Sequence, residues 1–461
     1  MLDPSVPAIA ANRFGLGARP AELAAIGADG REWLHAQLKG APPALAGAQL
    51  RPSAEILAQG LKLRHELEEA KKSGTAQDLE RLGQYLRPIY TTEVIARFQQ
   101  AATTERPFVE RLTQFWANHF AVSIDKQFLA GLAGGFEREA IRPHVLGRFS
   151  DMLLAVESHP AMLIYLDNHL SVGPHSPAAL RAERRQGPRK IGINENLARE
   201  IMELHTLGVG SGYTQADVTS FAEVITGWSI GDDRGRFAGG TPGEFVFRAE
   251  LHEPGAKVVL NTRYADSGVG QGVAVLRDLA RQQATARFIA TKLVRHFVAD
   301  EPPPAAVGRV AGAFTASEGD LPTVYRALLD AHEAWAQPLS KFKTPSDFIV
   351  SAYRGLALPV EAGKGPLAPF ELLGQRTWSP GSPAGWPDRS ADWDGASAVI
   401  KRIEWADAVG ARVGSRRDAA ELAPQLLGAN LSDATRTAVA RAASAAQGLT
   451  LLLASPEFMR R

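Results

Sequence analysis

A helix-forming stretch that begins at Asn194 carries two carboxylates and an amide at helical spacing. Glu200 and Glu203 lie three residues apart, and Asn196 lies one turn before Glu200. At 3.6 residues per turn, these side chains share one face of a helix. Such a face can bind a hard divalent cation or supply an acid–base pair. It can equally be a solvated face on which Arg199 is the counter-charge.

The helix that positions these side chains can be recognised from its two ends. Asn194 is a good N-cap, and Gly208 can take the left-handed conformation that closes a helix. After a glycine-rich turn, Thr214 and Asp217 predict a capping box at the start of a second helix. The face opposite the carboxylates is apolar, and His205 falls on it together with Leu197, Ala198, Ile201, Met202 and Leu204.

This helical hairpin and several distant segments together resemble a bacterial family. The matching segments are 194–209, 212–215, 217–218 and 226–228 in the hairpin, and elsewhere 115–120, 159–162, 165–168, 292–293, 296–297, 385–387 and 454–458. The family is catalogued as Domain of Unknown Function 1800, and the resemblance covers nearly the whole chain. It implies no activity. Many members are exported and encoded beside a family resembling alkaline phosphatases and sulfatases, which makes that group a candidate partner by association.

Charge and composition exclude several classes of protein. Lys and Arg number 51 against 50 Asp and Glu, so no basic field favours nucleic acid or an anionic membrane. The absence of cysteine excludes disulfides, thiolate metal ligands and cysteine nucleophiles. No apolar stretch reaches the ~18 residues of a membrane span. The first residues lack the basic and apolar regions of a signal peptide, so we expect a cytoplasmic protein, unlike many relatives.

Helical periodicity dominates and predicts a mainly α-helical fold, a compact multi-helix assembly with one small β-hairpin insertion. The convincing strand-like runs are 245–248 and 257–260. We divide the chain into five regions that are integrated as one domain. They are N-terminal helices (1–90), a central helical core with the signature hairpin (91–230), the β-hairpin insertion (231–272), a helical region (273–357), and an aromatic loop followed by C-terminal helices (358–461).

Three further candidate residues lie outside the helical hairpin. His119 lies in an aromatic stripe that predicts burial, either as a hydrogen-bonded core histidine or as a ligand or proton carrier. Asn168 belongs to a segment that resembles the family, and His252 lies in the turn between the two strand-like runs. The loop at 358–397 is rich in Pro, Gly and Trp, and such a loop can wall a pocket.

Two functions of different kinds remain open. The first is an enzyme with Glu200, Glu203 and His119 as catalytic groups, and with a substrate that the sequence does not identify. Carboxylates and imidazoles suit a divalent metal or metal-free acid–base chemistry. The second is a non-catalytic binding or assembly protein, in which the same groups form a buried polar network between helices. The ligand-binding candidates are Asn168, Asn196, Arg199, His205 and His252.

Overall fold

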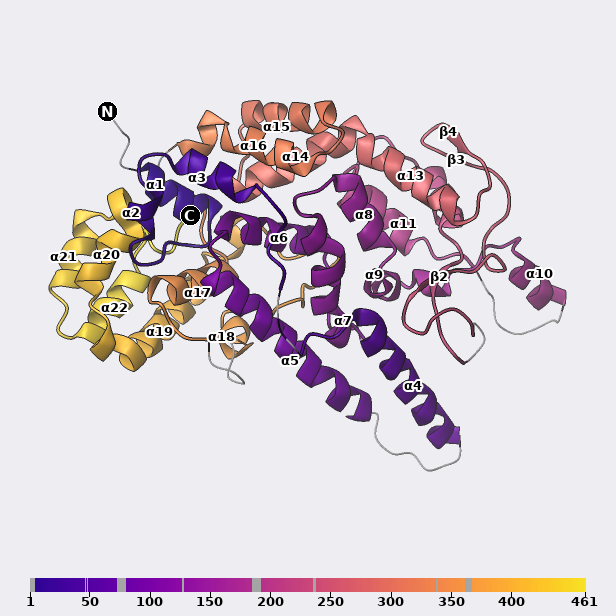
Figure 1. The fold of residues 1–461 in the computed structure, drawn as a ribbon, viewed down its shortest axis with the longest axis horizontal. Coiled ribbons are helices and arrows are strands. Elements are labelled where there is room, and N and C mark those ends of the chain that lie inside the picture. Colours follow the sequence, from indigo (N-terminus) through magenta and orange to yellow (C-terminus); the bar gives the residue numbers. More distant parts are fainter. Residues whose placement is uncertain are drawn as a thin grey trace.

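The computed structural model describes the chain apart from residues 1–4, 46, 48, 73–79, 127, 185–191, 235–237, 337–338 and 361–366. The described residues are mainly helical, with two small antiparallel strand pairs, which confirms the predicted fold class. The molecule is elongated, with the last helices at one end and the strand pairs at the other (Figure 1). No helix among the described residues is both long and apolar enough to cross a membrane.

The first helices cover one end of the molecule and then extend into a long pair. The elements are α1 (Val6–Ile9), the π-helix η1 (Ala10–Phe14), α2 (Glu22–Ile26), α3 (Gly30–Gln37), α4 (Ser53–Lys72) and α5 (Glu80–Thr103). Figure 1 shows the far ends of α4 and α5 projecting together from the body. Both helices pack on α7, which anchors the pair.

The central region contains most of the elements that carry the candidate residues. Its elements are α6 (Pro107–His119), α7 (Leu129–Phe136), η2 (Glu137–Ile141), η3 (Arg142–His144), α8 (Phe149–Glu157), α9 (Pro160–Tyr165), η4 (Asn168–Leu170), α10 (Pro177–Arg184), α11 (Asn196–Glu200), η5 (Ile201–His205) and α12 (Gln215–Val224). Helix α6 is buried over most of its length, including Glu110 and Arg111. Arg142 donates two hydrogen bonds of 2.5 and 2.9 Å to Glu110, and these bonds offset the cost of burying its charge.

The predicted helical hairpin is present, with one change in its first helix. Residues 201–205 form a π-helix, η5, so the helix that starts in α11 is wider and underwound at its end. The chain leaves η5 through Gly208, whose φ is 90°. The capping box between Thr214 and Asp217 is present at the start of α12.

The two predicted strand-like runs are both strands, but they do not pair with each other. Strand β2 (Phe245–Phe247) pairs with β1 (Trp228–Ile230), in the register Trp228 to Phe247. Strand β3 (Lys257–Val259) pairs with β4 (Thr262–Tyr264). Leu260 and Asn261 between β3 and β4 have φ of 50° and 62°, as a tight hairpin turn requires. The insertion therefore contains two small sheets, because each run pairs with a short strand that was not predicted.

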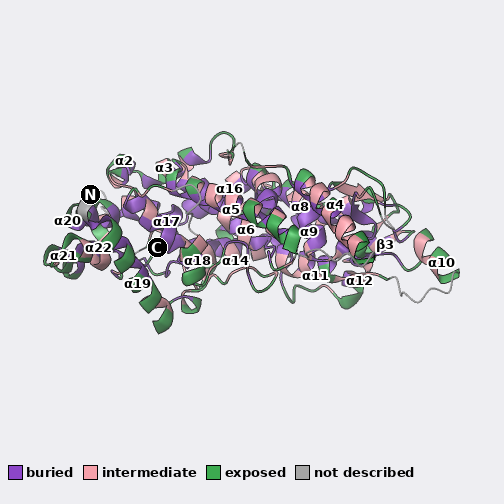
Figure 2. Cartoon of the chain, turned by 90° about the horizontal axis from the view of Figure 1, so that it is seen from below, coloured by how far each residue is buried: buried purple, intermediate pink, exposed green. Residues whose placement is uncertain are grey.

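The remaining helices return the chain to its beginning. They are α13 (Val269–Arg281), α14 (Gln283–Phe297), α15 (Pro304–Ala316), α16 (Leu321–Leu329), η6 (His332–Trp335), α17 (Pro345–Gly355), α18 (Leu367–Leu372), η7 (Ser390–Asp392), α19 (Ala396–Val413), η8 (Gly414–Arg416), α20 (Ala419–Leu427), η9 (Gly428–Asn430), α21 (Asp433–Ala440) and α22 (Ala445–Leu453). Helix α20 packs on α2. Buried apolar residues form one contiguous cluster from Ile9 to Met459, which runs along the middle of the body in Figure 2.

Candidate functional site

The carboxylates on the first helix of the hairpin lie in a partly exposed ion-pair cluster. Arg199 lies 3.2 Å from Glu195 and 3.5 Å from Glu203, and these three side chains are between 24% and 36% exposed. Asn196 is exposed. Burial raises the pKa of Glu200, and the neighbouring charge of Glu203 raises it further. This cluster resembles the solvated face that was one of the two sequence-based interpretations.

His119 and His205 belong instead to a buried network between α6, α8 and η5. His119 is 1% exposed, which confirms its predicted burial. Its Nε2 lies 3.1 Å from the His205 carbonyl oxygen, and the Nδ1 of His205 lies 2.8 Å from a Glu157 oxygen. Burial, and then the charges of Lys292 and His205, lower the pKa of His119 well below its usual range. The structure therefore joins these two histidines to Glu157 and not to Glu200 or Glu203.

Asn168 and His252 both bind the backbone where α12 ends and β1 begins. Asn168 is buried and donates to the carbonyl oxygens of Ile225 and Trp228, at 3.1 and 3.2 Å. The Nδ1 of His252 lies 3.0 Å from the Thr226 carbonyl oxygen. These contacts fix the entry to the first strand pair, and they place both residues apart from the charged cluster on α11.

Two adjoining cavities lie between α6, α14 and the predicted aromatic loop. The first has a volume of about 100 Å³ and the second about 270 Å³. Trp386 lines both cavities and Trp378 lines the first, so the loop walls a pocket as its composition predicts. The residues common to both linings are Asn118, His296, Trp386, Pro387 and Asp388.

Asn118 and Gly385 hold the loop against α6. The amide of Asn118 donates to the Trp386 carbonyl oxygen at 2.9 Å and accepts from the Trp386 N–H at 2.7 Å. The φ of Gly385 is 84°, and a Cβ at this position would lie 2.3 Å from the Asn118 carbonyl oxygen. Only glycine permits both the angle and the approach. The loop is therefore locked in the position that brings Asp388 to α14.

His296 lies in the wall shared by the two cavities and is oriented by Asp388. Its Nδ1 lies 3.1 Å from a carboxylate oxygen of Asp388. Its Nε2 is buried and has no hydrogen-bond partner among the described residues. Burial lowers the pKa of His296 to about 4, against the opposing effect of Asp388. The imidazole is therefore neutral at neutral pH, with its proton on Nδ1 and a free lone pair on Nε2.

A buried ion-pair network contacts Asp388 and the backbone of His296. The guanidinium of Arg461 lies 2.9 Å from Asp347 and 3.4 Å from Asp388, and it donates to the His296 carbonyl oxygen at 2.7 Å. Arg111 pairs with Asp347 at 3.3 Å. Burial opposes ionisation of Asp347, but Arg111 and Arg461 hold its pKa well below the usual range. These groups fix the position of Asp388 and hence the orientation of the imidazole.

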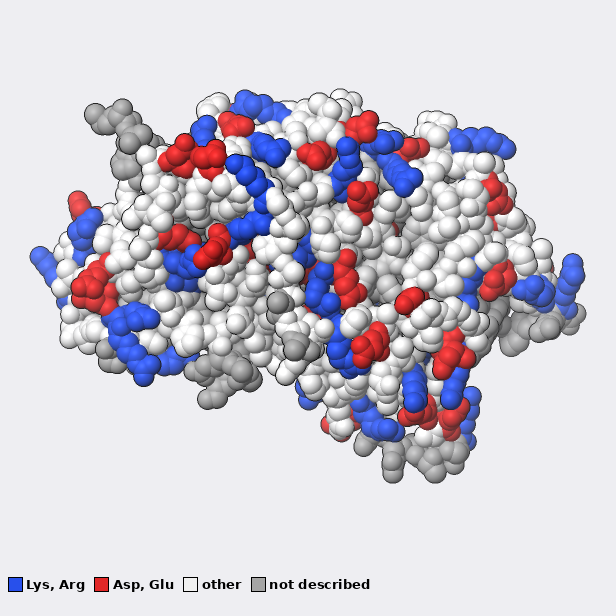
Figure 3. All heavy atoms as spheres, in the orientation of Figure 1, with Lys and Arg blue, Asp and Glu red and all other residues white. Residues whose placement is uncertain are grey.

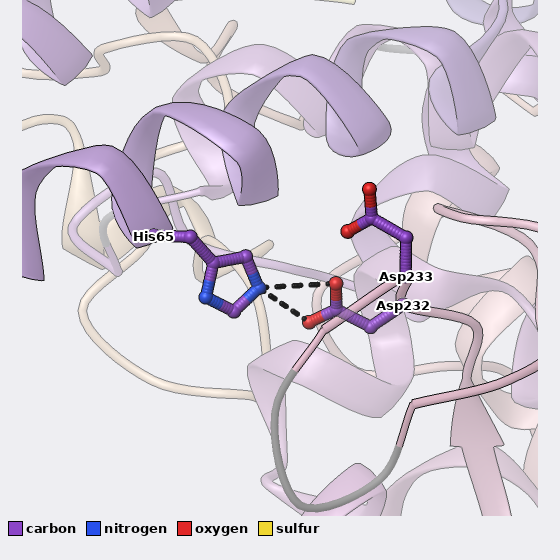
Figure 4. A group of neighbouring side chains, drawn as sticks. All are labelled: His65, Asp232 and Asp233. Atoms are coloured by element: carbon purple, nitrogen blue, oxygen red, sulfur yellow. Dashed lines mark hydrogen bonds and ion pairs between the residues drawn. The ribbon is translucent and has the colours of Figure 1, made fainter. Parts of the chain in front are cut away.

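One group of three side chains in the described part of the chain has spacing that could hold a metal ion, and it lies elsewhere. It consists of His65 on α4 and Asp232 and Asp233 after β1 (Figure 4). The Nε2 of His65 lies 3.1 and 3.0 Å from the two oxygens of Asp232, and Arg64 lies 3.8 Å from the same carboxylate. These contacts describe an ion pair that ties α4 to the strand region.

Sequence reasoning missed most of the residues around the cavities. His296, Lys292 and Trp386 lie inside segments that resemble the family, and Asp388 follows one of them by a single position. Those segments were the available signal. Arg111, Asp347 and Arg461 carried no such signal, because each lies outside those segments in an ordinary helical or terminal context. The network, rather than any local pattern, gives them a role.

Comparison with known proteins places the chain in a family without assigning an activity. A family model described as a protein of unknown function, DUF1800, matches residues 9–460. Comparison with curated proteins and with solved structures finds no match.

Proposed function

The chain belongs to the DUF1800 family of proteins of unknown function, and from its cavities we propose that it is an enzyme in which His296 is the general base. The observation that carries the proposal is the free Nε2 of His296, buried in the wall of two cavities. A buried imidazole nitrogen without a partner costs stability, so a core histidine is normally bonded through both nitrogens. A proton from a ligand hydroxyl or from water is the natural partner for this lone pair.

The surrounding residues have separate roles in this mechanism. Asp388 accepts a hydrogen bond from the Nδ1–H of His296 and thereby fixes the tautomer that leaves the lone pair on Nε2. Its negative charge also stabilises the imidazolium that forms when Nε2 takes a proton. Arg461 and Arg111 act through Asp347 and Asp388 as positioning residues. The sequence predicts a carboxylate–histidine site with Glu200, Glu203 and His119, and the site proposed here has other residues, His296 and Asp388, at its centre.

The proposal assigns acid–base chemistry to this site and no metal. In the described part of the chain, His119, His296 and the cavity carboxylates do not form a group of three ligand atoms close enough to share one ion. Metal analysis of the purified protein tests this separately. A stoichiometric metal that is lost on substitution of His296 would overturn the assignment.

The alternative is a non-catalytic binding or assembly protein. The network of His119, His205 and Glu157 favours it, because three helical elements are tied together by buried polar bonds. Under this alternative, His296 and Asp388 are a second network of the same kind. By family association, a protein resembling alkaline phosphatases or sulfatases is the partner to test, by co-expression and co-purification.

The experiment that separates the two uses His296→Gln, with His332→Gln as the control. The His332 side chain is 81% exposed and lies outside both cavities. Purified proteins are compared on a panel of chromogenic esters, phosphoesters and glycosides, and in thermal unfolding. We expect His296→Gln to lower turnover by about 10²–10⁴-fold and to leave stability unchanged or raised. A loss of about 1–3 kcal/mol without any change in turnover supports the network alternative.

A further inference from the structure

Helix α14 presents two cations to the second cavity on the same face as His296. Lys292, Arg295 and His296 stand at positions i, i+3 and i+4, so their side chains are neighbours. All three line the cavity of about 270 Å³. The proposed general base therefore stands directly beside two cationic side chains.

Neither cation has a carboxylate partner among the described residues. The Lys292 ammonium lies 5.5 Å from the centroid of the Phe288 ring, and Arg295 has a buried Nε without a hydrogen bond. Burial lowers the pKa of Lys292 to about 8, and the charge of Arg295 lowers it further while Asp388 opposes the shift. Asp388 is already engaged by His296 and Arg461. Two like charges thus face one cavity without dedicated counter-charges.

The acidic groups at the cavity do not remove this excess. The carboxylate of Asp392 lines the cavity at an exposed position, and Arg389, which also lines it, pairs with Glu301 at 3.0 Å. An exposed carboxylate is strongly screened by water and interacts weakly with a partly buried ammonium. The cavity therefore has more cationic side chains than carboxylates, since Lys292, Arg295 and Arg389 line it with Asp388 and Asp392.

The inner wall of the cavity adds an unpaired acceptor. His119 is 1% exposed and lines the cavity, and its Nδ1 has no hydrogen-bond partner among the described residues. Because its Nε2 donates to the His205 carbonyl oxygen, Nδ1 carries a lone pair and accepts. The cavity thus offers cationic donors from Lys292 and Arg295, and neutral acceptors from His119 and His296.

We propose that the second cavity binds the oxyanion group, carboxylate or phosphate, of a small ligand that also bears a hydroxyl. Lys292 and Arg295 pair with the oxyanion, and the hydroxyl donates to an imidazole nitrogen of the cavity. This assignment rests on the proposed function, because it brings a ligand hydroxyl to the general base. A bound anion also favours the protonated form of His296, which moves its basicity towards the useful range.

The test measures thermal shifts of the full chain with three probes at matched ionic strength. They are inorganic phosphate, glycolate and acetate, with sodium chloride as the reference. We expect phosphate and glycolate to raise the unfolding temperature and acetate to act more weakly, since acetate has no hydroxyl. The shifts should weaken above about pH 8, where Lys292 loses its proton. A phosphate shift without a glycolate shift would assign a phosphate ligand, and the reverse result a carboxylate.

Three variants locate the effect on α14. Lys292→Met and Arg295→Met should each weaken binding at least tenfold by isothermal titration with the most effective probe. Arg287→Met is the matched control, because Arg287 is an exposed cation of the same helix outside this cavity. His296→Gln should keep most of the anion shift and lose turnover. Equal shifts in the wild type and both cavity variants, or no shift with any probe in the wild type, overturn the anion site. Neither result bears on turnover, which tests the general base separately.

Discussion

Two regions of this molecule are rich in ionisable side chains, and they differ in how those charges are neutralised. On α11 and η5, Glu195, Arg199 and Glu203 pair with near neighbours along one helix and stay 24% to 36% exposed. Around the cavities, Arg111 and Arg461 are 1% to 2% exposed and neutralise carboxylates far away in the sequence. The face drawn in Figure 3 carries interspersed charges of both signs. The comparison teaches that dense local charge indicates a solvated face, whereas buried charge requires tertiary partners.

The largest effect should come from Asp347→Asn in the buried network. The substitution leaves Arg111 and Arg461 without their shared counter-charge, and such a loss costs about 3–5 kcal/mol. The free energy of unfolding in urea measures it. Asp433→Asn is the control, because the Asp433 side chain is fully exposed, and it should stay within about ±0.5 kcal/mol. A loss for Asp347→Asn as small as that of the control would remove the distinction between the two regions.

His119→Leu tests the network that connects the two regions. The substitution leaves the His205 carbonyl oxygen without its donor and should cost about 1–3 kcal/mol. His144→Leu is the matched control, because His144 is only partly buried and outside the network. If His119→Leu is neutral or stabilising by denaturant unfolding, then His119 is merely a core side chain.

Lys343→Met tests, through the pH dependence of stability, whether a buried charge near the cavities behaves differently from an exposed one. Burial lowers the pKa of Lys343 to about 7 from an ordinary value of 10.5. Between these values the unfolded chain binds more protons than the folded one, so the free energy of unfolding contributed by this group rises with pH. We expect a rise of about 1–2 kcal/mol from pH 7 to pH 9, within the limit of ~1.4 kcal/mol per pH unit for one proton.

In Lys343→Met this pH-dependent rise should disappear, and the variant should be at least as stable as the wild type at pH 7. The matched control is Lys401→Met, which removes an exposed lysine of α19 and should leave the rise intact. Identical pH profiles for the wild type and Lys343→Met would show that Lys343 remains protonated in the folded protein.

The smallest change in stability should come from substitutions of Glu200 and Glu203, on the helix that the sequence analysis starts from. Glu200→Gln and Glu203→Gln should each change the free energy of unfolding by no more than about ±0.5 kcal/mol, as for a surface face. Because burial raises the pKa of Glu200, its substitution should be neutral or slightly stabilising at pH 7. Loss of turnover or of bound metal in either variant, at unchanged stability, would return the catalytic assignment to these glutamates.

The helical architecture could be predicted from the sequence because its signals are local. The amphipathic period, the capping box of Thr214 and Asp217, and the stop at Gly208 all act within a few residues. The prediction of strand pairing was wrong, because the partner of a strand is not a local property of the sequence. The strand 245–247 pairs with residues 228–230, a strand that was not predicted. Pairing partners are chosen by tertiary packing, which a single run does not encode.

The candidate site was predictable only in part for the same reason. The burial of His119 followed from its aromatic neighbours, and the pocket-walling loop followed from its composition. The pairing of His296 with Asp388 joins residues on different elements, and Arg461 reaches both from a third. Nothing in the spacing of these residues marks them, because their proximity is created by the fold. Of these residues, only His296 lies in a segment that resembles the family, and that was the only signal in the sequence.

The participation of Arg461 has a consequence for the order in which the protein is made. Arg111 lies on the central helix α6, and the carboxylate it shares with Arg461 is flanked by charges from α14, α17 and the loop at Asp388. At ~5–20 residues per second, a ribosome needs about 20 to 70 s to travel from one of these arginines to the other. Asp347 supplies the counter-charge of Arg111 as soon as α17 is made, and Arg461 is the later partner that completes the pairing of Asp347 and Asp388.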